Sequence, residues 1–313
     1  MNVIETTNLW KRYGKKAAVS GVNMHVQQGD IYGFIGRNGS GKSTTLKLLC
    51  GLAAPTEGSI RLFGKAPEEP SSRKRVGALI ETAGLEPDQS AHENMLLKAM
   101  LLGLVDPEPQ IRQLLPLVGL DPSDRKKAKK FSMGMKQRLG IAMALLGSPD
   151  LLILDEPING LDPEGMSQIR NLLMDLNRKK GVTILISSHI LGELSKMATR
   201  YGILKDGELI REITEEELDN ECRDYLYVKV DNAKGAAVVL EEKCGLHDYE
   251  IRPEGEIRIY EKELEPAAVT AALAAEGIAV QAIYPHSQDL EGYFLELMGQ
   301  EDASARKGGD FHA

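Results

Sequence analysis

The sequence predicts an α/β protein with a second, smaller α+β domain. Short apolar runs at residues 31–35, 151–154 and 182–186 have the length and continuous hydrophobicity of buried parallel strands. Segments with helical periodicity alternate with these runs. After about residue 221 the expected elements change to a β-α-β-β-α-β order. We therefore expect one large domain at 1–220 and a small one at 221–300.

The composition is typical of a globular protein. Any role at a membrane would need a partner that spans the bilayer. The 313 residues are 42% hydrophobic and carry a net charge of -8, which argues against generic nucleic-acid binding. The chain has no run of roughly 20 apolar residues to span a bilayer and no apolar signal-peptide core at its start. Three cysteines without metal-like spacing predict a reduced, cytosolic protein.

Residues 1–220 are expected to form a β-rich subdomain, a core and a helical insertion. Turn-bounded apolar residues predict additional strands at 3–9, 22–26 and 59–63. Helical periodicity predicts helices at 44–50, 91–104, 110–118, 133–146 and 166–180. Because three of these helices follow one another without a strand, we expect a helical subdomain at about 85–147.

Residues 221–300 are expected to form a ferredoxin-like domain. The predicted elements are a strand at 224–230, a helix at 233–243, strands at 249–252 and 256–260, a helix at 266–275 and a strand at 279–283. Their order is that of the ferredoxin-like fold. A final helix at 287–298 and a polar, disordered tail at 301–313 complete the expected organisation.

A glycine-rich loop between a strand and a helix predicts a phosphate site. The residues from Gly36 to Thr44 read GRNGSGKST and fit the pattern G-x-x-x-x-G-K-[ST]. In such a P-loop, backbone N–H groups and a helix N-terminus bind phosphate oxygens. We expect Lys42 to contact the β- and γ-phosphates of a nucleotide and Ser43 to hold Mg²⁺. The other loop residues expected to bind the nucleotide are Gly36, Asn38, Gly39, Ser40, Gly41 and Thr44.

Polar residues follow two of the predicted core strands. Asp155 is expected to coordinate Mg²⁺ directly or through water, and Glu156 to activate the attacking water as general base. His189 follows the run at 182–186 and is expected to contact the γ-phosphate. The simpler alternatives are a buried strand that ends in acidic residues and a structural histidine.

A second anion-binding element is predicted before the helix at 133–146. Phe131 to Arg138 read FSMGMKQR, and Ser132 occupies the N-cap position, with Gly134 just inside the helix. Two phosphate-binding elements in one chain predict two nucleotide sites between two chains. Each site would combine one chain's P-loop with the Ser132–Gly134 turn of the other.

With these motifs, the chain resembles the ATP-binding subunits of ABC transporters over about residues 1–220. The resemblance implies a Walker A loop at 36–44, a Walker B aspartate and catalytic glutamate at Asp155 and Glu156, and a switch histidine at His189. It also implies that Asp162 lies in the D-loop that reaches the opposite site. Tyr13 resembles the aromatic residue that stacks on adenine, although a turn residue without such a role is the alternative.

Two departures from the family pattern narrow the resemblance. The usual signature L-S-G-G-Q is replaced by residues 131–135, FSMGM, which keep Ser132 and Gly134. The Q-loop position carries Glu81 instead of glutamine. Both changes, and the segment 289–298, are similar to the bacitracin- and lantibiotic-export branch, which implies a role in antibiotic resistance. We hypothesise that Glu81 ligates Mg²⁺ or its water and couples hydrolysis to the permease.

The resemblance implies an ATPase that dimerises around two ATP molecules, with Mg²⁺, at the cytoplasmic face of the cell membrane. Its implied partners are an integral-membrane permease and a second copy of the chain, with no nucleic acid. One alternative is a soluble ABC ATPase that acts on ribosomes or nucleic acid, which the single cassette and the acidic charge disfavour. Another is a regulator that binds ATP without turnover, which Glu156 and His189 disfavour. We interpret the basic run at 125–130 as a solvated loop.

Overall fold

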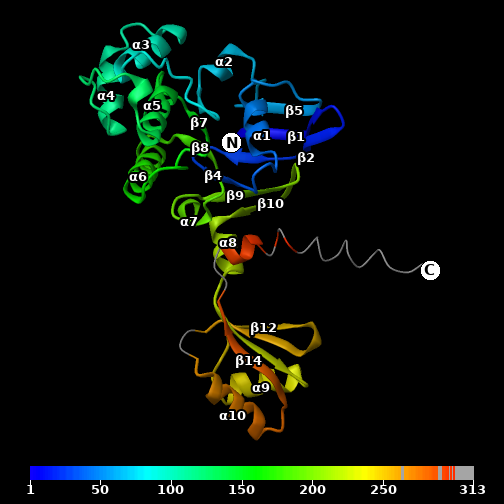
Figure 1. The fold of residues 1–313 in the computed structure, drawn as a ribbon. Coiled ribbons are helices and arrows are strands. Elements are labelled where there is room, and N and C mark those ends of the chain that lie inside the picture. Colours follow the sequence, from blue (N-terminus) through cyan, green and yellow to red (C-terminus); the bar gives the residue numbers. More distant parts are fainter. Residues whose placement is uncertain (262–263, 288–290, 296, 298, 300–313) are drawn as a thin grey trace, which may run out of the picture. The chain divides into compact units, whose positions relative to one another are not determined.

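The computed structural model describes residues 1–261, 264–287, 291–295, 297 and 299, which form the ribbon coloured by sequence in Figure 1. The chain divides into two compact units, Met1–Glu215 and Glu216–Ala313. Mixed sheets and helices in both units confirm the predicted α/β class. We keep 1–220 and 221–300 as proposed domain limits. The predicted tail at 301–313 lies outside the described residues.

A six-stranded sheet forms the core of the first unit. Its strands, in sheet order, are β10 (Glu208–Thr214), β9 (Arg200–Lys205), β4 (Ile31–Ile35), β8 (Thr183–Ser188), β7 (Leu151–Asp155) and β6 (Val76–Leu79). All neighbouring pairs are parallel except β10 with β9. Every residue of β4, β7 and β8 is buried, which explains why these strands are continuous apolar runs in the sequence.

The sheet order determines where polar side chains meet. Because β4, β8 and β7 are parallel neighbours, their carboxyl ends lie at one edge of the sheet. The P-loop leaves β4 at this edge and continues into α1 (Lys42–Leu49). The chain returns from β7 to β8 through α6 (Pro163–Lys180). The residues that follow β4, β7 and β8 are therefore brought together.

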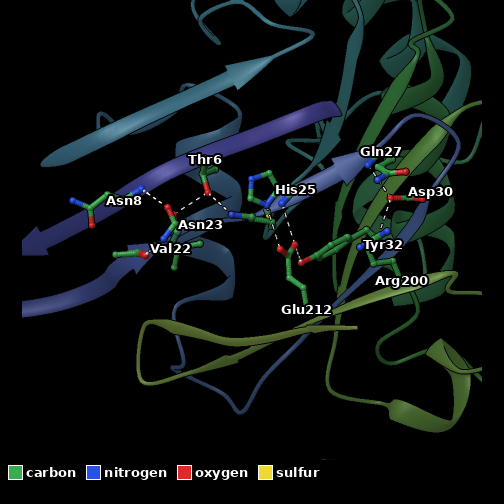
Figure 2. Close-up of polar contacts among 12 residues, drawn as sticks. Thr6, Asn8, Val22, Asn23, His25, Gln27, Asp30, Tyr32, Arg200 and Glu212 are labelled. Atoms are coloured by element: carbon green, nitrogen blue, oxygen red, sulfur yellow. Dashed lines mark hydrogen bonds and ion pairs between the residues drawn. The ribbon is translucent and has the colours of Figure 1, made fainter. Parts of the chain in front are cut away.

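A four-stranded antiparallel sheet makes up the predicted β-rich subdomain. Its strands are β1 (Asn2–Tyr13), β2 (Lys16–Val22), β3 (His25–Gln27) and β5 (Glu57–Leu62). The single strand predicted at 22–26 is interrupted at Asn23 and Met24, where β2 ends, and continues in the same direction beside β1 as β3. At the interruption, side chains connect the segment to β1: Asn8 N donates to Asn23 Oδ1 at 2.7 Å, and Met24 N donates to Thr6 Oγ1 at 2.9 Å (Figure 2).

One buried tyrosine connects the two sheets of the first unit. The Tyr32 hydroxyl, on β4, donates to Glu212 Oε1 of β10 at 2.8 Å, and the same oxygen accepts from His25 N of β3 at 3.0 Å (Figure 2). A Cβ on Gly202 would lie 2.1 Å from the Tyr32 hydroxyl, so only glycine leaves space for this contact. The strand that leads into the P-loop is thereby fixed to its neighbours.

The helical insertion contains the three helices predicted for it. They are α3 (Ala91–Leu101), α4 (Glu108–Leu117) and α5 (Met133–Leu145). The first begins with a capping box between Ser90 and Glu93 and ends before Gly103, whose φ of 67° stops the helix. The elements that the sequence did not predict are β2, β6, β9, β10, α2 (Pro70–Arg73), α7 (Leu191–Leu194) and α8 (Glu215–Glu221).

The second unit has the predicted β-α-β-β-α-β order. Its elements are β11 (Tyr225–Val230), α9 (Ala233–Glu242), β12 (Tyr249–Arg252), β13 (Glu256–Ile259), α10 (Pro266–Ala275) and β14 (Val280–His286). The sheet order β12-β13-β11-β14 is fully antiparallel. Val228, Leu240 and Leu273, from the sheet and both helices, are fully buried in its core. Residues 291–295 are helical, and the rest of the last predicted helix lies partly outside the described residues.

Candidate nucleotide-binding site

At two positions, Gly36 and Gly41, the P-loop backbone lies so close to other atoms that no side chain larger than that of glycine fits. A Cβ on Gly36 would lie 2.4 Å from Ser40 Oγ and 2.5 Å from Leu204 O. Gly41 has a φ of 108°, in the left-handed region, and a Cβ there would lie 2.3 Å from Ala18 O. The loop is therefore packed against β9 and β2, and its backbone is wrapped tightly at the start of α1.

The loop lines a cavity of about 360 Å³. The side chains around it come from three separate parts of the chain: Tyr13, Lys16, Ala18, Asn38, Gly39, Gly41, Lys42, Ser43, Thr44 and Glu156. Tyr13 lies at the end of β1 and is largely exposed, with Lys11 Nζ 5.1 Å from its ring centroid. An exposed ring at the border of this cavity is suited to stacking on a planar base.

Lys42 is buried inside this loop. Its Nζ donates to Gly36 O at 2.7 Å and to Arg37 O at 3.3 Å, and lies 3.8 Å from Glu156 Oε1. Burial lowers the pKa of Lys42, while the charges of Glu156 and Asp155 oppose this shift. A desolvated ammonium held by neutral carbonyl groups is available to an incoming phosphate.

The acidic pair after β7 contacts the end of β8. Ser187 Oγ donates to Asp155 Oδ1 at 2.5 Å and accepts from Glu156 N at 3.0 Å. The Glu156 carboxylate lies between two cationic or polar partners, with Oε2 2.8 Å from His189 Nδ1 and Oε1 3.8 Å from Lys42 Nζ. The structure thus brings together Lys42, Glu156 and His189, the three predicted catalytic residues.

The donor set at this strand edge fits Mg²⁺. Mg²⁺ prefers oxygen ligands and binds in phosphate-transfer sites through one or two protein oxygens, phosphates and several waters. Asp155 offers a buried carboxylate and Ser43 a hydroxyl at the first turn of α1. Within the described ranges, no three His, Cys, Asp or Glu residues cluster as a metal cage, which this mode of binding does not require.

Glu81, the third predicted metal ligand, lies away from the P-loop cavity. It follows β6 with a φ of 59°, and its Oε1 is 2.6 Å from Lys47 Nζ at the last turn of α1. The hydrogen bond to Glu81 raises the pKa of Lys47. Glu81 borders a different cavity of about 370 Å³, which it shares with Met133 and Gln137 of α5. Its role as a metal ligand stays a prediction.

The predicted second anion element lies at the start of α5. Ser132 is the N-cap, and its Oγ accepts from Met135 N at 3.2 Å. Gly134 approaches Leu161 so closely that a Cβ would lie 3.1 Å from its side chain. Asp162 is the N-cap of α6 and accepts from Gly165 N at 3.1 Å. None of these three predicted residues lines the P-loop cavity of its own chain, as the described residues define it.

Comparison with known proteins identifies the family. The model of the ABC transporter family matches residues 19–159. The bacitracin transport ATP-binding protein BcrA of Bacillus licheniformis is 41% identical over 299 residues, which are 95% of this chain and 97% of that protein. The chain belongs to the ABC transporter ATP-binding proteins.

Two further relatives agree with this assignment. The lantibiotic transport ATP-binding protein SrtF of Streptococcus pyogenes is 44% identical over 210 residues, which cover 67% of this chain and 90% of that protein. A dimeric ATP-binding cassette, MJ0796, solved in a post-hydrolysis state with ADP and Pi, is 28% identical, with a TM-score of 0.62 over 68% of this chain and 98% of that one.

As an ABC ATP-binding subunit, the protein binds ATP and couples its hydrolysis to transport. ATP-binding subunits of ABC transporters dimerise and work with membrane permease subunits. Among the described helices, none has the length and apolar character to cross a bilayer.

Three residues around the nucleotide cavity and Glu156 were not predicted. Lys16 and Ala18 of β2 line the nucleotide cavity, and Gln137 Nε2 of α5 donates to Glu156 O at 3.2 Å. Gln137 lies within the signature segment FSMGMKQR, so its position was visible in the sequence. Its contact with Glu156 O was not predictable, since no local pattern indicates which backbone carbonyl a helix side chain reaches.

Proposed function

We propose that this subunit dimerises around two Mg·ATP and drives a membrane permease that exports antimicrobial peptides. The observation that carries the proposal is a site that is complete on one side only. Lys42 and Glu156 line the P-loop cavity and His189 contacts Glu156, whereas Ser132 and Asp162, which belong to the same family motifs, are not among the lining residues. A second chain that supplies Ser132 and Asp162 completes each site.

Within each site the residues divide into binding and chemical roles. The ring of Tyr13 stacks on adenine, and the N–H groups of residues 36–44, with Lys42, bind the phosphates. Asp155 and Ser43 hold Mg²⁺, which when bound neutralises charge on the β- and γ-phosphate oxygens. Ser132 and Gly134 of the second chain contact the γ-phosphate through the N-terminus of α5.

Glu156 is the general base of the reaction. Its carboxylate takes a proton from water as that water attacks the γ-phosphorus, and ADP leaves with the electrons of the broken bond. His189, 2.8 Å from Glu156 Oε2, orients the carboxylate towards the γ-phosphate. When phosphate departs, the contact between P-loop and Ser132 is lost and the dimer opens. ATP therefore shifts a two-state equilibrium by contacts that exist only in the closed dimer.

A groove with exposed leucines beside the helical subdomain supports a permease partner at the cytoplasmic face of the membrane. A cavity of about 620 Å³ lies between residues of α1, β6 and α3, and Leu52, Leu101 and Leu102 are exposed at it. The segment 82–84, directly after Glu81, lines the same groove. Exposed apolar surface of this kind marks an interaction site. A permease segment that binds here would contact the segment of Glu81, which links it to the nucleotide site.

The class of substrate is inferred from relatives. BcrA and SrtF are named for bacitracin transport and lantibiotic transport, and LnrL of Bacillus subtilis, 29% identical over 95% of this chain, is a linearmycin resistance protein. BcrA resembles this chain over both units, so the likeness includes the second unit as well as the nucleotide-binding part. An antimicrobial peptide or a similar membrane-active compound fits these relatives.

The proposal is tested by isolating the tagged protein from its own cells in mild detergent. We expect a multi-spanning membrane protein to co-purify in a stoichiometric amount. After reconstitution into vesicles, the pair should take up a bacitracin- or lantibiotic-type peptide only with hydrolysable ATP. Recovery of ribosomal proteins or nucleic acid without any membrane protein would contradict the proposal and support a soluble ABC ATPase.

A further inference from the structure

The signature helix α5 makes a direct contact with the catalytic glutamate of its own chain. Gln137 lies on the second turn of the helix, five residues after the N-cap Ser132, or about 7.5 Å along the axis. Its Nε2 donates to the backbone carbonyl oxygen of Glu156 at 3.2 Å. One rigid helix therefore carries Ser132 at its start and a hydrogen-bond donor to the Glu156 peptide group one turn further on.

The backbone of Glu156 needs such support. Its φ of 50° is in the left-handed region, which a residue with a side chain adopts only where its surroundings stabilise it. The N–H of Glu156 donates to Ser187 Oγ at 3.0 Å, and its carbonyl oxygen accepts from Asn159 N at 3.1 Å as well as from Gln137. Of these partners, Gln137 is the one that belongs to the signature helix.

We propose that Gln137 is a positioning residue for the general base. Its amide holds the Glu156 peptide group in the left-handed conformation, which directs the carboxylate towards the P-loop cavity. The inference rests on the proposed function, in which Ser132 contacts the nucleotide of the second chain. A nucleotide bound at Ser132 then fixes α5, and through Gln137 it fixes the general base of the other site. The two ATP sites of a dimer are thus coupled within each chain.

The cavity around Gln137 indicates how this contact can change. Gln137, Met133 and Glu81 border the same cavity of about 370 Å³, so the amide is not packed on all sides. A shift of α5 has space to break the bond to Glu156. Without the bond, Glu156 retains its contacts to Ser187 and Asn159 but loses its connection to the signature helix.

The test is a Gln137→Glu variant, which keeps the shape of the side chain and replaces the donor by an acceptor. We expect kcat for ATP hydrolysis to fall on the order of tenfold or more, because a small displacement of a reacting group has a large effect on rate. KM for ATP should stay within about twofold, since the P-loop contacts are unchanged. Gln168→Glu on α6, where Nε2 donates to Glu164 Oε1 at 3.1 Å, is the matched control and should leave both values unchanged.

A double-mutant cycle separates positioning from general damage to the fold. If Gln137 acts through Glu156, then Gln137→Glu should change the residual turnover of a Glu156→Gln protein by less than about twofold. An equal loss in both backgrounds, or wild-type kcat in Gln137→Glu, would overturn the inference and leave the proposed function intact. Absence of ATP turnover in the wild-type protein would overturn the proposed function, and the inference with it. Gln137→Met, which removes the donor without adding charge, replaces Gln137→Glu if that variant does not fold.

Discussion

Two glutamates of the first unit have the same local setting but different surroundings. Glu156 and Glu81 follow neighbouring core strands, both have a positive φ, and each faces a lysine of α1. The Glu156–Lys42 pair is 3.8 Å apart, with side chains 22% and 6% exposed. The Glu81–Lys47 pair is 2.6 Å apart, with side chains 57% and 33% exposed.

Burial, rather than distance, distinguishes Glu156 and Lys42, the pair proposed to be catalytic, from Glu81 and Lys47. The shorter contact, between Glu81 and Lys47, lies in solvent, where an ion pair contributes about 0–1 kcal/mol to stability. The longer contact buries an ammonium, and the lowered pKa of Lys42 shows that this burial disfavours its charge. A protein tolerates this cost where an anionic ligand is bound, which is the role proposed for Lys42. Glu81 is free to exchange its partner.

Among the variants, the largest effect is expected for Glu156→Gln. Removal of the general base should lower ATP turnover by roughly 10²–10⁴-fold, the contribution of positioned acid–base groups. The rate of phosphate release at saturating Mg·ATP measures it. Glu164→Gln, in the first turn of α6, is the control and should turn over ATP at the wild-type rate. A Glu156→Gln protein within threefold of wild type would show that another group is the base.

The next effect concerns the metal. Chelation of Mg²⁺ should abolish turnover, and Asp155→Asn should need at least about tenfold more Mg²⁺ for half-maximal activity, since a neutral amide is a weaker ligand than a carboxylate. A titration of turnover with Mg²⁺ gives both values. Asp175→Asn is the matched control, because Asp175 pairs with Lys179 on the surface of α6. The same Mg²⁺ requirement in Asp155→Asn would contradict the proposed ligand.

Glu81→Ala tests the role of the exposed pair of Glu81 with Lys47. The free energy of unfolding should change by less than about 1 kcal/mol, because the pair with Lys47 is exposed. Peptide transport and permease-coupled turnover should fall, because Glu81 precedes the segment that lines the groove with the exposed leucines. Lys47→Ala removes the ion pair but keeps the carboxylate, so it should retain transport. If both activities of Glu81→Ala equal those of wild type, the coupling role is wrong.

The smallest effect is expected for a third pair, Glu93 with Lys127. Glu93 accepts from Ser90 N at 2.6 Å and from Lys127 Nζ at 3.0 Å, and these bonds, the backbone one first, lower its pKa from 4.5 to about 2. Because the pKa is lower in the folded state, the stabilisation is present above pH 4.5 and is lost as the pH falls towards 2.

Glu93→Gln should therefore lower the thermal midpoint at pH 7 slightly, on the order of 1 °C. The difference from wild type should shrink between pH 4.5 and 2. Thermal unfolding followed by circular dichroism at several pH values measures it. A difference that is constant over this range would mean that the carboxylate charge does not stabilise α3.

The sequence was sufficient for the parts of the site that depend on local pattern. Continuous apolar runs predicted β4, β7 and β8, because strands buried on both faces contain little else. The places of the P-loop after β4 and of the acidic pair at the end of β7 also follow from local pattern. The ferredoxin-like order of the second unit followed from alternating periodicity and turn residues.

The parts that were missed depend on contacts between distant segments. The burial of β2 and β10 is mixed along each strand, so neither shows a simple alternation or a continuous run. The distant partners of Glu156 include Ser187 of β8, Gln137 of α5 and Lys42 of α1, and their meeting follows from sheet order and helix packing. The contact of the Glu81 carboxylate with Lys47, 34 positions away, was not predicted either, while the ligand role of Glu81 stays a prediction. A motif identifies residue types, and packing determines what each one contacts.

The most direct test of the central proposal is the mass of the Glu156→Gln protein in solution. Light scattering on a sizing column, with saturating Mg·ATP, should give twice the mass of a single chain, because ATP closes the dimer and cannot be hydrolysed. A Glu156→Gln/Ser132→Ala protein should stay largely at the mass of one chain, since the second chain's contact to the γ-phosphate is removed. A Glu156→Gln protein that remains a monomer at saturating Mg·ATP would contradict a site shared between two chains.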